Sequence, residues 1–318
     1  MATYLITGVA GFIGSALAGA VLAQGDQVRG IDNLATGRRE NLAEIVHRID
    51  FQEVDLLDLQ AIYNVCRGVD YVLHEAAIPS VPKSVLDPLG SNRANLDGTV
   101  NLLVAARDAK VKRVVYAASS SAYGDTPTLP KHEEMTPNPI SPYAVAKLAS
   151  EHYMISFYRC YGLETVCLRY FNIFGPRQDP TSPYSGVLAK FITQMLKGEQ
   201  PTILGDGKQS RDFTFVDNAV EANLLACKAA ANEVAGRVFN VATGRRVDLN
   251  ETFQILKKLT GYPGSVTYGP ERAGDVKHSL ADLSRAKKHL GYTPKVDFEE
   301  GLRRTIDWYR NQERAARA

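Results

Sequence analysis

Two side chains suited to proton transfer stand four residues apart in the pattern Y-x-x-x-K at residues 143–147. This spacing places Tyr143 and Lys147 on one face of a helix, one turn apart. An unperturbed phenol has a pKa of about 10 and is a poor base at neutral pH. A neighbouring ammonium stabilises the phenolate, so the pair predicts that Tyr143 exchanges a proton with a substrate hydroxyl.

Small hydroxyl residues follow an apolar run that we expect to be a buried strand, residues 114–118. Open α/β sheets bind ligands just beyond the carboxyl ends of their strands. Ser119 at that position can hydrogen-bond a reacting oxygen and complete a Ser-Tyr-Lys group. The alternative is a serine-rich turn without chemistry, and the nearby Y-x-x-x-K pattern favours the catalytic interpretation.

A third pattern, T-G-x-x-G-F-I-G at residues 7–14, joins the first expected strand to the first helix. Glycine permits a tight turn and a close approach of the backbone to a pyrophosphate, and the helix N-terminus offers free N–H groups. The pattern predicts a dinucleotide site at Gly8, Gly11, Phe12, Ile13 and Gly14. A strand–helix turn without a ligand is the alternative.

The end of the second expected strand indicates which dinucleotide binds. Asp32 lies about twenty residues past the glycines, where a carboxylate bonds the adenosine ribose and repels a 2′-phosphate. NAD is therefore predicted, with Asn33 beside the ribose, while the arginines at 38–39 leave NADP as the minority alternative. After the third strand, Asp55 and Leu56 are predicted to hold the adenine, an ordinary strand-end turn being the alternative.

The elements that must position these residues alternate between short apolar runs and amphipathic segments, which indicates β-α units and a parallel sheet covered on both faces. The expected strands are Tyr4–Thr7, Gln27–Ile31, Phe51–Val54, Tyr71–His74, Val114–Ala118 and Thr165–Arg169, and the clearest helices are Phe12–Gln24, Leu96–Ala109 and Pro142–Tyr161. We expect an α/β fold with a Rossmann-type doubly wound parallel sheet over residues 1–172, to which later segments return. A smaller C-terminal α/β lobe, residues 173–318, is expected to bind the substrate, and the tail from Arg310 is expected to fray.

The composition narrows the class of protein. The formal net charge of +2 is too small to indicate nucleic acid or a membrane surface as a partner. No stretch approaches the ~18 apolar residues that span a bilayer. Four separated cysteines indicate reduced thiols in a cytoplasmic protein, and we expect no metal site.

Taken in order, the motifs resemble the extended short-chain dehydrogenase/reductases, and within them the UDP-hexose 4-epimerases. The resemblance also rests on H-E-A-A at residues 74–77 and L-R-Y-F-N at residues 168–172, and it covers nearly the whole chain. It implies an NAD-dependent enzyme with Ser119 as the catalytic serine, and with Ser120 and Ser121 lining a sugar pocket. It places Asn95 near the nicotinamide, a polar helix-start residue being the alternative. It further implies a homodimer that pairs the helices Leu96–Ala109 and Pro142–Tyr161 of each subunit.

By the same resemblance, residues of the second half bind a UDP-sugar. Asn172, Arg211 and Arg272 match positions that contact the diphosphate, and a guanidinium suits phosphate oxygens. Asp275 matches the residue that holds the ribose. Ser279 matches the position where a tyrosine narrows the pocket in glucose-specific relatives, so it leaves room for a 2-N-acetyl group.

The reaction follows from what stands beside the catalytic group. Related dehydratases carry an Asp-Glu pair there and decarboxylases a glutamate, whereas this chain has two serines at 120–121. We therefore predict reversible oxidation at the sugar C4 and epimerisation of UDP-glucose, and of UDP-N-acetylglucosamine as well. UDP-glucuronate stays open because Arg177 lies in a loop that can meet a carboxylate. A nucleotide-sugar reductase or dehydrogenase and a non-catalytic NAD-binding protein are the remaining alternatives.

Overall fold

Seven parallel strands form the central sheet of this computed structural model, which describes residues 1–180, 186–271 and 277–317. Their order across the sheet is β11-β6-β5-β4-β1-β2-β3, and every neighbouring pair is parallel. Because helices cover both faces, the strand side chains are buried on both sides and their sequences are largely apolar. The strands are β1 (Thr3–Thr7), β2 (Gln27–Asp32), β3 (Asp50–Glu53), β4 (Tyr71–His74), β5 (Arg113–Ser119), β6 (Glu164–Tyr170) and β11 (Arg237–Val241).

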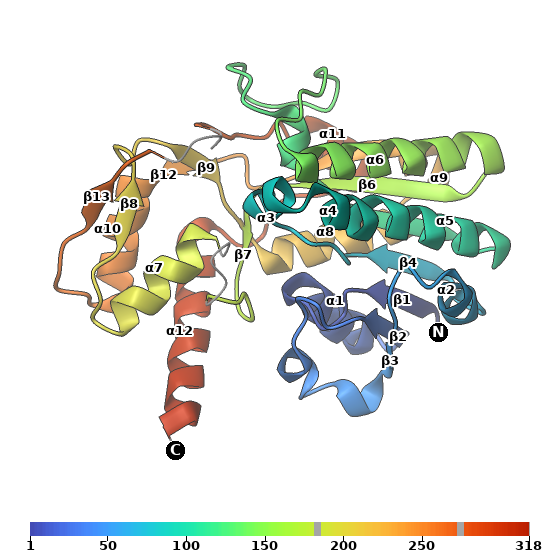
Figure 1. Cartoon of the computed structure of the whole chain (residues 1–318), viewed down its shortest axis with the longest axis horizontal. Coiled ribbons are helices and arrows are strands. Elements are labelled where there is room, and N and C mark those ends of the chain that lie inside the picture. The colour runs from blue at the N-terminus through green and yellow to red at the C-terminus, as the bar shows by residue number, and fades with distance from the viewer. Residues whose placement is uncertain (181–185, 272–276, 318) are drawn as a thin grey trace.

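The helices form a layer on each face of this sheet (Figure 1). One layer contains α2 (Leu59–Cys66), α5 (Gly98–Asp108) and α6 (Pro142–Tyr161), with the short helices α3 (Val81–Leu86) and α4 (Pro88–Asn92) packed against α6. A π-helical turn, Arg93–Asp97, joins α4 to α5. The opposite layer contains α1 (Phe12–Ala23) and α8 (Val216–Lys228), while α9 (Ala231–Val234) and α11 (Ser284–Leu290) pack near the β11 edge.

A smaller lobe stands beside the carboxyl ends of the strands (Figure 1). Its helices are α7 (Val187–Leu196), α10 (Leu249–Thr260) and α12 (Phe298–Arg317). Three short strand pairs complete it, namely β7 (Ile173–Phe174) with β10 (Thr214–Phe215), β9 (Ser210–Asp212) with β12 (Arg246–Asp248), and β8 (Thr202–Leu204) with β13 (Thr267–Gly269). Phe213 and Phe298 stack in the apolar core where the lobe meets the sheet domain, and Phe174 packs edge-on against both.

The predicted fold class is confirmed, and the predicted strands and helices lie within a few residues of the observed ones. The sequence analysis did not identify β11 or α8, which come from the second half of the chain and complete the sheet and its second helical layer. The expected fraying after Arg310 is wrong, because α12 continues to Arg317. Its first turns carry ion pairs from Glu299 and Glu300 to arginines three and four residues later, which support a helix. The division of the chain at residue 172 stays a prediction.

Two absences can be stated for the described part of the chain. Within it, no helix combines the length and the apolar character that crossing a lipid bilayer requires. Over the same residues, no group of three or more histidine, cysteine, aspartate or glutamate side chains is arranged to hold a metal ion.

Candidate active site

The carboxyl ends of β1, β4, β5 and β6 lie side by side and bring the predicted residues to one edge of the sheet. Thr7 pairs with His74, and Ser119 pairs with Tyr170, the last residue of β6. Asn172 follows two residues later. Residues more than a hundred positions apart in the sequence thereby meet at the edge where parallel sheets bind ligands.

The glycine-rich turn after β1 has no room for side chains. Gly8 has a φ of +67°, and a Cβ on it would lie 2.8 Å from the Cα of Ala76. A Cβ on Gly14 would lie 2.2 Å from the carbonyl oxygen of Gly8. No side chain caps α1 at Gly11, so the N–H groups of its first turn, including those of Phe12 and Ile13, remain available to an anion. These features fit the pyrophosphate of a dinucleotide.

Asp32, at the end of β2, is hydrogen-bonded to this turn. It is 8% exposed, and its carboxylate accepts hydrogen bonds from the backbone N–H groups of Ala10 (3.0 Å) and Leu34 (2.8 Å). Burial raises the pKa of Asp32, while the two N–H bonds lower it. A carboxylate in this place suits ribose hydroxyls and is unfavourable for a 2′-phosphate.

The other predicted adenosine residues differ in exposure. Asn33 is exposed, and its Nδ2 donates to Asp55 Oδ2 (2.9 Å), so these two side chains lie together at the surface. Leu56 is 7% exposed and packs against α5, where a Cβ on Gly98 would lie 2.8 Å from it. Leu56 therefore contributes mainly to the core.

The arginines that left NADP open are each paired with a carboxylate. Arg38 Nη2 lies 2.6 Å from Asp179 Oδ2, and Arg39 Nη2 lies 2.5 Å from Glu53 Oε2. Both guanidinium groups thus have an acidic partner near the place where a 2′-phosphate would need them, which favours NAD.

Ser119 and Tyr143 meet at the end of β5. Ser119 Oγ accepts hydrogen bonds from the backbone N–H (3.2 Å) and the hydroxyl (2.8 Å) of Ser121. Tyr143 lies in the first turn of α6, which begins at Pro142 directly after the N-cap Ser141. Burial raises the pKa of Tyr143, and a hydrogen bond with Ser119 lowers it. Ser120 is half-buried beside them.

Lys147 lies one turn further along α6 and is 4% exposed. Its Nζ donates to the carbonyl oxygen of Ala117 (2.8 Å) and lies 4.7 Å from the ring centroid of Tyr116. Burial lowers the pKa of Lys147 to about 8, and the charge of Glu75 opposes this shift. From the sequence we expect a neighbouring ammonium to stabilise the Tyr143 phenolate; the effects on the pKa of Tyr143 in the structure are those of burial and of Ser119.

Asn95 lies behind this group, in the π-helical turn. It is 1% exposed; its Oδ1 accepts from Ile78 N (2.8 Å), and its Nδ2 donates to Ser91 Oγ (3.2 Å). Its carbonyl oxygen accepts from Ser150 of α6 (2.9 Å). The side chain expected near the nicotinamide therefore joins the loop after β4 to α4, and its backbone supports α6.

The predicted sugar-nucleotide residues begin at Asn172, whose Nδ2 donates to Asp212 O (3.1 Å) and to Ser279 Oγ (3.2 Å). Ser279 is 8% exposed and also accepts from Asp212 N (3.4 Å). Arg211 is half-buried, and its Nη1 donates to the carbonyl oxygens of Ser210 and Lys277, both at 3.1 Å. Two further predicted residues, Arg272 and Asp275, lie outside the described residues.

Sequence reasoning missed a half-buried carboxylate at the same edge. Glu75 follows β4, and its Oε1 accepts a hydrogen bond from the hydroxyl of Tyr170 (2.8 Å). Burial raises its pKa to about 7. The available signal was an acidic residue in an otherwise apolar segment directly after a buried strand.

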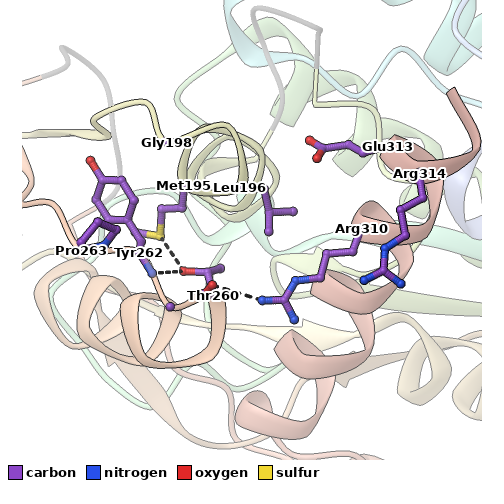
Figure 2. A pocket seen from close by; sticks show the side chains of 10 residues that line it. Met195, Leu196, Gly198, Thr260, Tyr262, Pro263, Arg310, Glu313 and Arg314 are labelled. Carbon is purple, nitrogen blue, oxygen red and sulfur yellow. Dashed lines mark hydrogen bonds between the residues drawn. The ribbon is translucent and has the colours of Figure 1, made fainter. Parts of the chain in front are cut away.

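A pocket of about 400 Å³ lies in the smaller lobe and contains none of the predicted residues (Figure 2). Arg310 Nη2 donates to the carbonyl oxygens of Leu259 (3.3 Å) and Thr260 (3.1 Å), at the carboxyl end of α10. The hydroxyl of Thr260 contacts Met195 Sδ and the backbone N–H of Tyr262. These hydrogen bonds supply partners to polar groups at the carboxyl end of α10, so we assign this pocket a structural role.

Comparison with known proteins identifies related chains. The model of the NAD dependent epimerase/dehydratase family matches residues 4–242. A UDP-glucose 4-epimerase of Mycolicibacterium smegmatis is 38% identical, over 97% of this chain and 98% of the relative. A UDP-glucuronate 4-epimerase of Thermodesulfobacterium geofontis is 33% identical, over 97% and 96%.

Solved structures of the same kind superpose closely. The UDP-glucose 4-epimerase of Thermotoga maritima with UDP-glucose has a TM-score of 0.93 and 39% identity, covering 98% of this chain and 99% of the other. The UDP-N-acetylglucosamine 4-epimerase of Methanobrevibacter ruminantium, in complex with UDP-N-acetylmuramic acid, has a TM-score of 0.93 and 40% identity over the same shares. The Thermus thermophilus UDP-glucose 4-epimerase with NAD has a TM-score of 0.89 and 38% identity, covering 97% and 99%.

Two glycine substitutions in α1 distinguish the lack of space at the dinucleotide turn from the effect of glycine on the stability of the helix. Gly14→Ala should lower both the melting temperature and the amount of bound NAD, because its Cβ would collide with Gly8. Gly19→Ala meets no atom within 4 Å and should stabilise the helix by roughly 0.5–1 kcal/mol with normal NAD binding. Thermal unfolding and the NAD content of the purified variants provide the measurement. Equal NAD content in both would contradict the assignment of this turn.

Proposed function

The chain belongs to the NAD dependent epimerase/dehydratase family, within which it is a UDP-sugar 4-epimerase, and we propose that it interconverts UDP-glucose with UDP-galactose and their N-acetylated counterparts. The observation that carries this proposal is the convergence of Ser119, Tyr143 and Lys147 at the carboxyl edge of the sheet, beside the turn that fits a pyrophosphate.

The proton-transfer step is assigned to Tyr143. Its phenol exchanges a proton with the sugar 4-hydroxyl, and Ser119 hydrogen-bonds the same oxygen as it becomes a carbonyl. Lys147, whose pKa is about 8, is mostly charged at neutral pH and stabilises negative charge that develops on the phenol. When bound, NAD supplies a hydride acceptor at C4 and returns the hydride to the opposite face of the ketone.

We assign the cofactor to the turn at residues 8–14, with Asp32 and Asn33 at its adenosine end. Asp55 extends this end through its hydrogen bond with Asn33. Leu56 supports it from the core, and Asn95 supports the nicotinamide end from behind through α6.

We assign the sugar nucleotide to the region around Asn172, with Ser120 and Ser121 on the sugar and Arg211, Arg272 and Asp275 on the nucleotide. The lobe after residue 172 supplies most of these groups. Ser279 supports acceptance of an N-acetyl group, because a small hydroxyl stands where a larger side chain would take up volume. By accepting a hydrogen bond from Asn172, Ser279 also positions the side chain that we assign to the diphosphate.

UDP-glucuronate is the second candidate, since a relative of that specificity is 33% identical. Arg177, the residue that could meet a carboxylate, has its Nη2 3.6 Å from Glu44 and its Nη1 3.5 Å from Ser15 Oγ. Both partners belong to the cofactor side of the molecule, so Arg177 gives this candidate little support. A reductase is less supported still, because the five related proteins named above are 4-epimerases.

We further propose a homodimer and a cytoplasmic setting. Val85, Leu86 and Leu89 are 63%, 78% and 72% exposed on α3 and α4, and Val145 of α6 is 52% exposed next to them, a surface that suits a second copy. All four cysteines are free thiols, as expected in a reducing compartment. Light scattering should give twice the chain mass of 34.8 kDa.

Incubation of the purified protein with individual UDP-sugars, without added cofactor, tests the function. Chromatography should show interconversion of UDP-glucose and UDP-galactose and of the N-acetylated pair, with no net production of NADH. Conversion of UDP-glucuronate alone would transfer the assignment to that sugar, and NADH accumulation would indicate a dehydrogenase.

Removal of the Tyr143 hydroxyl tests the proton-transfer assignment. Tyr143→Phe should lower kcat by at least ~100-fold with NAD content and melting temperature unchanged, because only the acid–base group is lost. Tyr153→Phe, at a residue 43% exposed on the same helix, serves as the matched control and should keep normal activity. Near-normal turnover of Tyr143→Phe would show that another group carries the proton.

Substitution at Ser279 tests the specificity assignment. Ser279→Tyr should reduce activity on UDP-N-acetylglucosamine at least ~10-fold more than on UDP-glucose, since the added ring occupies the N-acetyl volume. Ser279→Ala removes the hydrogen bond to Asn172 without adding volume and should affect both sugars equally. Equal losses in the tyrosine variant would remove the assignment of Ser279 as the size-limiting residue.

A further inference from the structure

A buried series of hydrogen bonds passes through His74, the last residue of β4. His74 pairs in the sheet with Thr7, which precedes the first glycine of the dinucleotide turn, and its Nδ1 lies 2.8 Å from Thr7 Oγ1. Its Nε2 lies 2.9 Å from Thr99 Oγ1 of α5. Thr7, His74 and Thr99 are 0%, 1% and 1% exposed. The imidazole therefore joins the dinucleotide turn to the helical layer that contains α6.

The partners of the two hydroxyls determine the direction of each hydrogen bond. Thr99 Oγ1 donates its single proton to the carbonyl oxygen of Asn95 (2.7 Å), so it accepts from His74, whose proton is on Nε2. Burial lowers the pKa of His74 to about 3, so the ring is neutral at pH 7 and its Nδ1 is an acceptor. Thr7 Oγ1 donates to this Nδ1 and accepts from the backbone N–H of Ala76 (3.1 Å).

At the Thr7 end, these hydrogen bonds hold the backbone against which the glycine turn packs. Ala76 N donates to Thr7 Oγ1, and a Cβ on Gly8 would lie 2.9 Å from the same nitrogen. Thr7 is also covalently joined to Gly8. A displacement of the Thr7 side chain would therefore disturb the close approach on which the turn depends.

At the other end, His74 is connected to α6 by two routes. The carbonyl oxygen of Asn95 accepts a second hydrogen bond from Ser150 Oγ (2.9 Å), and Ser150 lies on α6 three residues after Lys147. The rings of His74 and Tyr116 pack with their centroids 5.3 Å apart, and Lys147 Nζ lies 4.7 Å from the same Tyr116 centroid. Hydrogen bonds and ring packing thus both lead from His74 to the helix that carries the catalytic group.

We propose that His74 is a positioning residue, which as the Nε2–H tautomer keeps the turn assigned to NAD in register with the helix that carries Tyr143 and Lys147. The proposal rests on the proposed function, because it assumes that this turn holds the hydride acceptor and that Tyr143 exchanges the proton. Hydride and proton leave the adjacent atoms C4 and O4 of the sugar, so their two acceptors must be held at a fixed separation. The imidazole itself transfers no proton in this role.

Thr99→Val tests the link, because it removes the acceptor of the Nε2 proton and keeps the shape of the side chain. The variant should show a kcat on UDP-glucose about tenfold lower with an unchanged KM, since the reacting groups lose alignment while the sugar-nucleotide residues stay in place. Thr99→Ser keeps the hydroxyl and should retain most of the rate.

Thr252→Val of α10 is the matched control. Thr252 is 0% exposed, and its hydroxyl also donates at 2.7 Å to the carbonyl oxygen four residues earlier, that of Asp248. Both valine variants should have lower melting temperatures, but Thr252→Val should keep the kcat of the unaltered enzyme. Equal kcat values in the two valine variants would overturn the proposal.

Two measurements without substrate distinguish this proposal from the proposed function. His74→Gln can still donate to Thr99 through its amide nitrogen but offers Thr7 no acceptor, so it should bind NAD about fivefold more weakly, the scale of one lost hydrogen bond. Unchanged NAD affinity would overturn the proposal. If the unaltered protein epimerises no UDP-sugar, the proposed function fails, whereas weaker NAD binding by this variant would still support the link.

The tautomer can be observed in the unaltered protein, even if a variant does not fold. Ring ¹⁵N resonances at pH 7, assigned to His74 by correlation with its own backbone, should show a protonated Nε2 and an unprotonated Nδ1. A ring that carries its proton on Nδ1 would overturn the proposal, because it could not donate to Thr99.

Discussion

The candidate active site depends on how firmly α6 is held against the sheet. Tyr143, Lys147 and Glu151 follow one another at intervals of four and share one helix face. Glu151 forms two hydrogen bonds with Arg169 of β6, at 2.9 and 2.6 Å, and both side chains are 3% exposed. Removing one member of such a pair leaves a buried charge and typically costs about 3–5 kcal/mol. The ion pair therefore fixes the rotation of α6, and with it the directions of the phenol and the ammonium.

The smaller lobe is joined to this edge by a compact polar junction. Asp212 is 0% exposed and accepts hydrogen bonds from the backbone N–H groups of Thr243, Gly244 and Ala281. Its own carbonyl oxygen accepts from Asn172, directly after β6. The buried carboxylate thus ties two segments, at residues 243–244 and at 281, to β9, while the backbone of Asp212 joins β9 to the segment after β6. This arrangement explains how a lobe made of short strand pairs can present a defined surface to a nucleotide.

Burial governs the electrostatics of the site. It raises the pKa of Glu75 and lowers that of Lys147, so the neutral and charged forms of these two groups lie close in free energy near physiological pH, and it raises the pKa of Tyr143, which favours the neutral phenol. Groups whose two protonation states are close in free energy can gain and lose protons during turnover. The surface ion pairs of Arg38 and Arg39 do not need to change their protonation.

The sequence alone determined the fold class and the preference for NAD, and it predicted the glycine turn and the Ser-Tyr-Lys group, because local period, glycine spacing and strand ends carry that information. It did not identify β11 or α8, since a five-residue strand and a helix from the second half join the sheet only through long-range packing. For Asn95 we expected a place near the nicotinamide, with a polar helix-start residue as the alternative. Tertiary contacts instead place its amide inside the protein. The meeting of Glu75 with Tyr170 was decided by the order of strands in the sheet, which sets β4 and β6 on either side of β5 and brings together two residues 95 positions apart. No local pattern encodes that order, because it follows from how the whole chain buries its apolar surface.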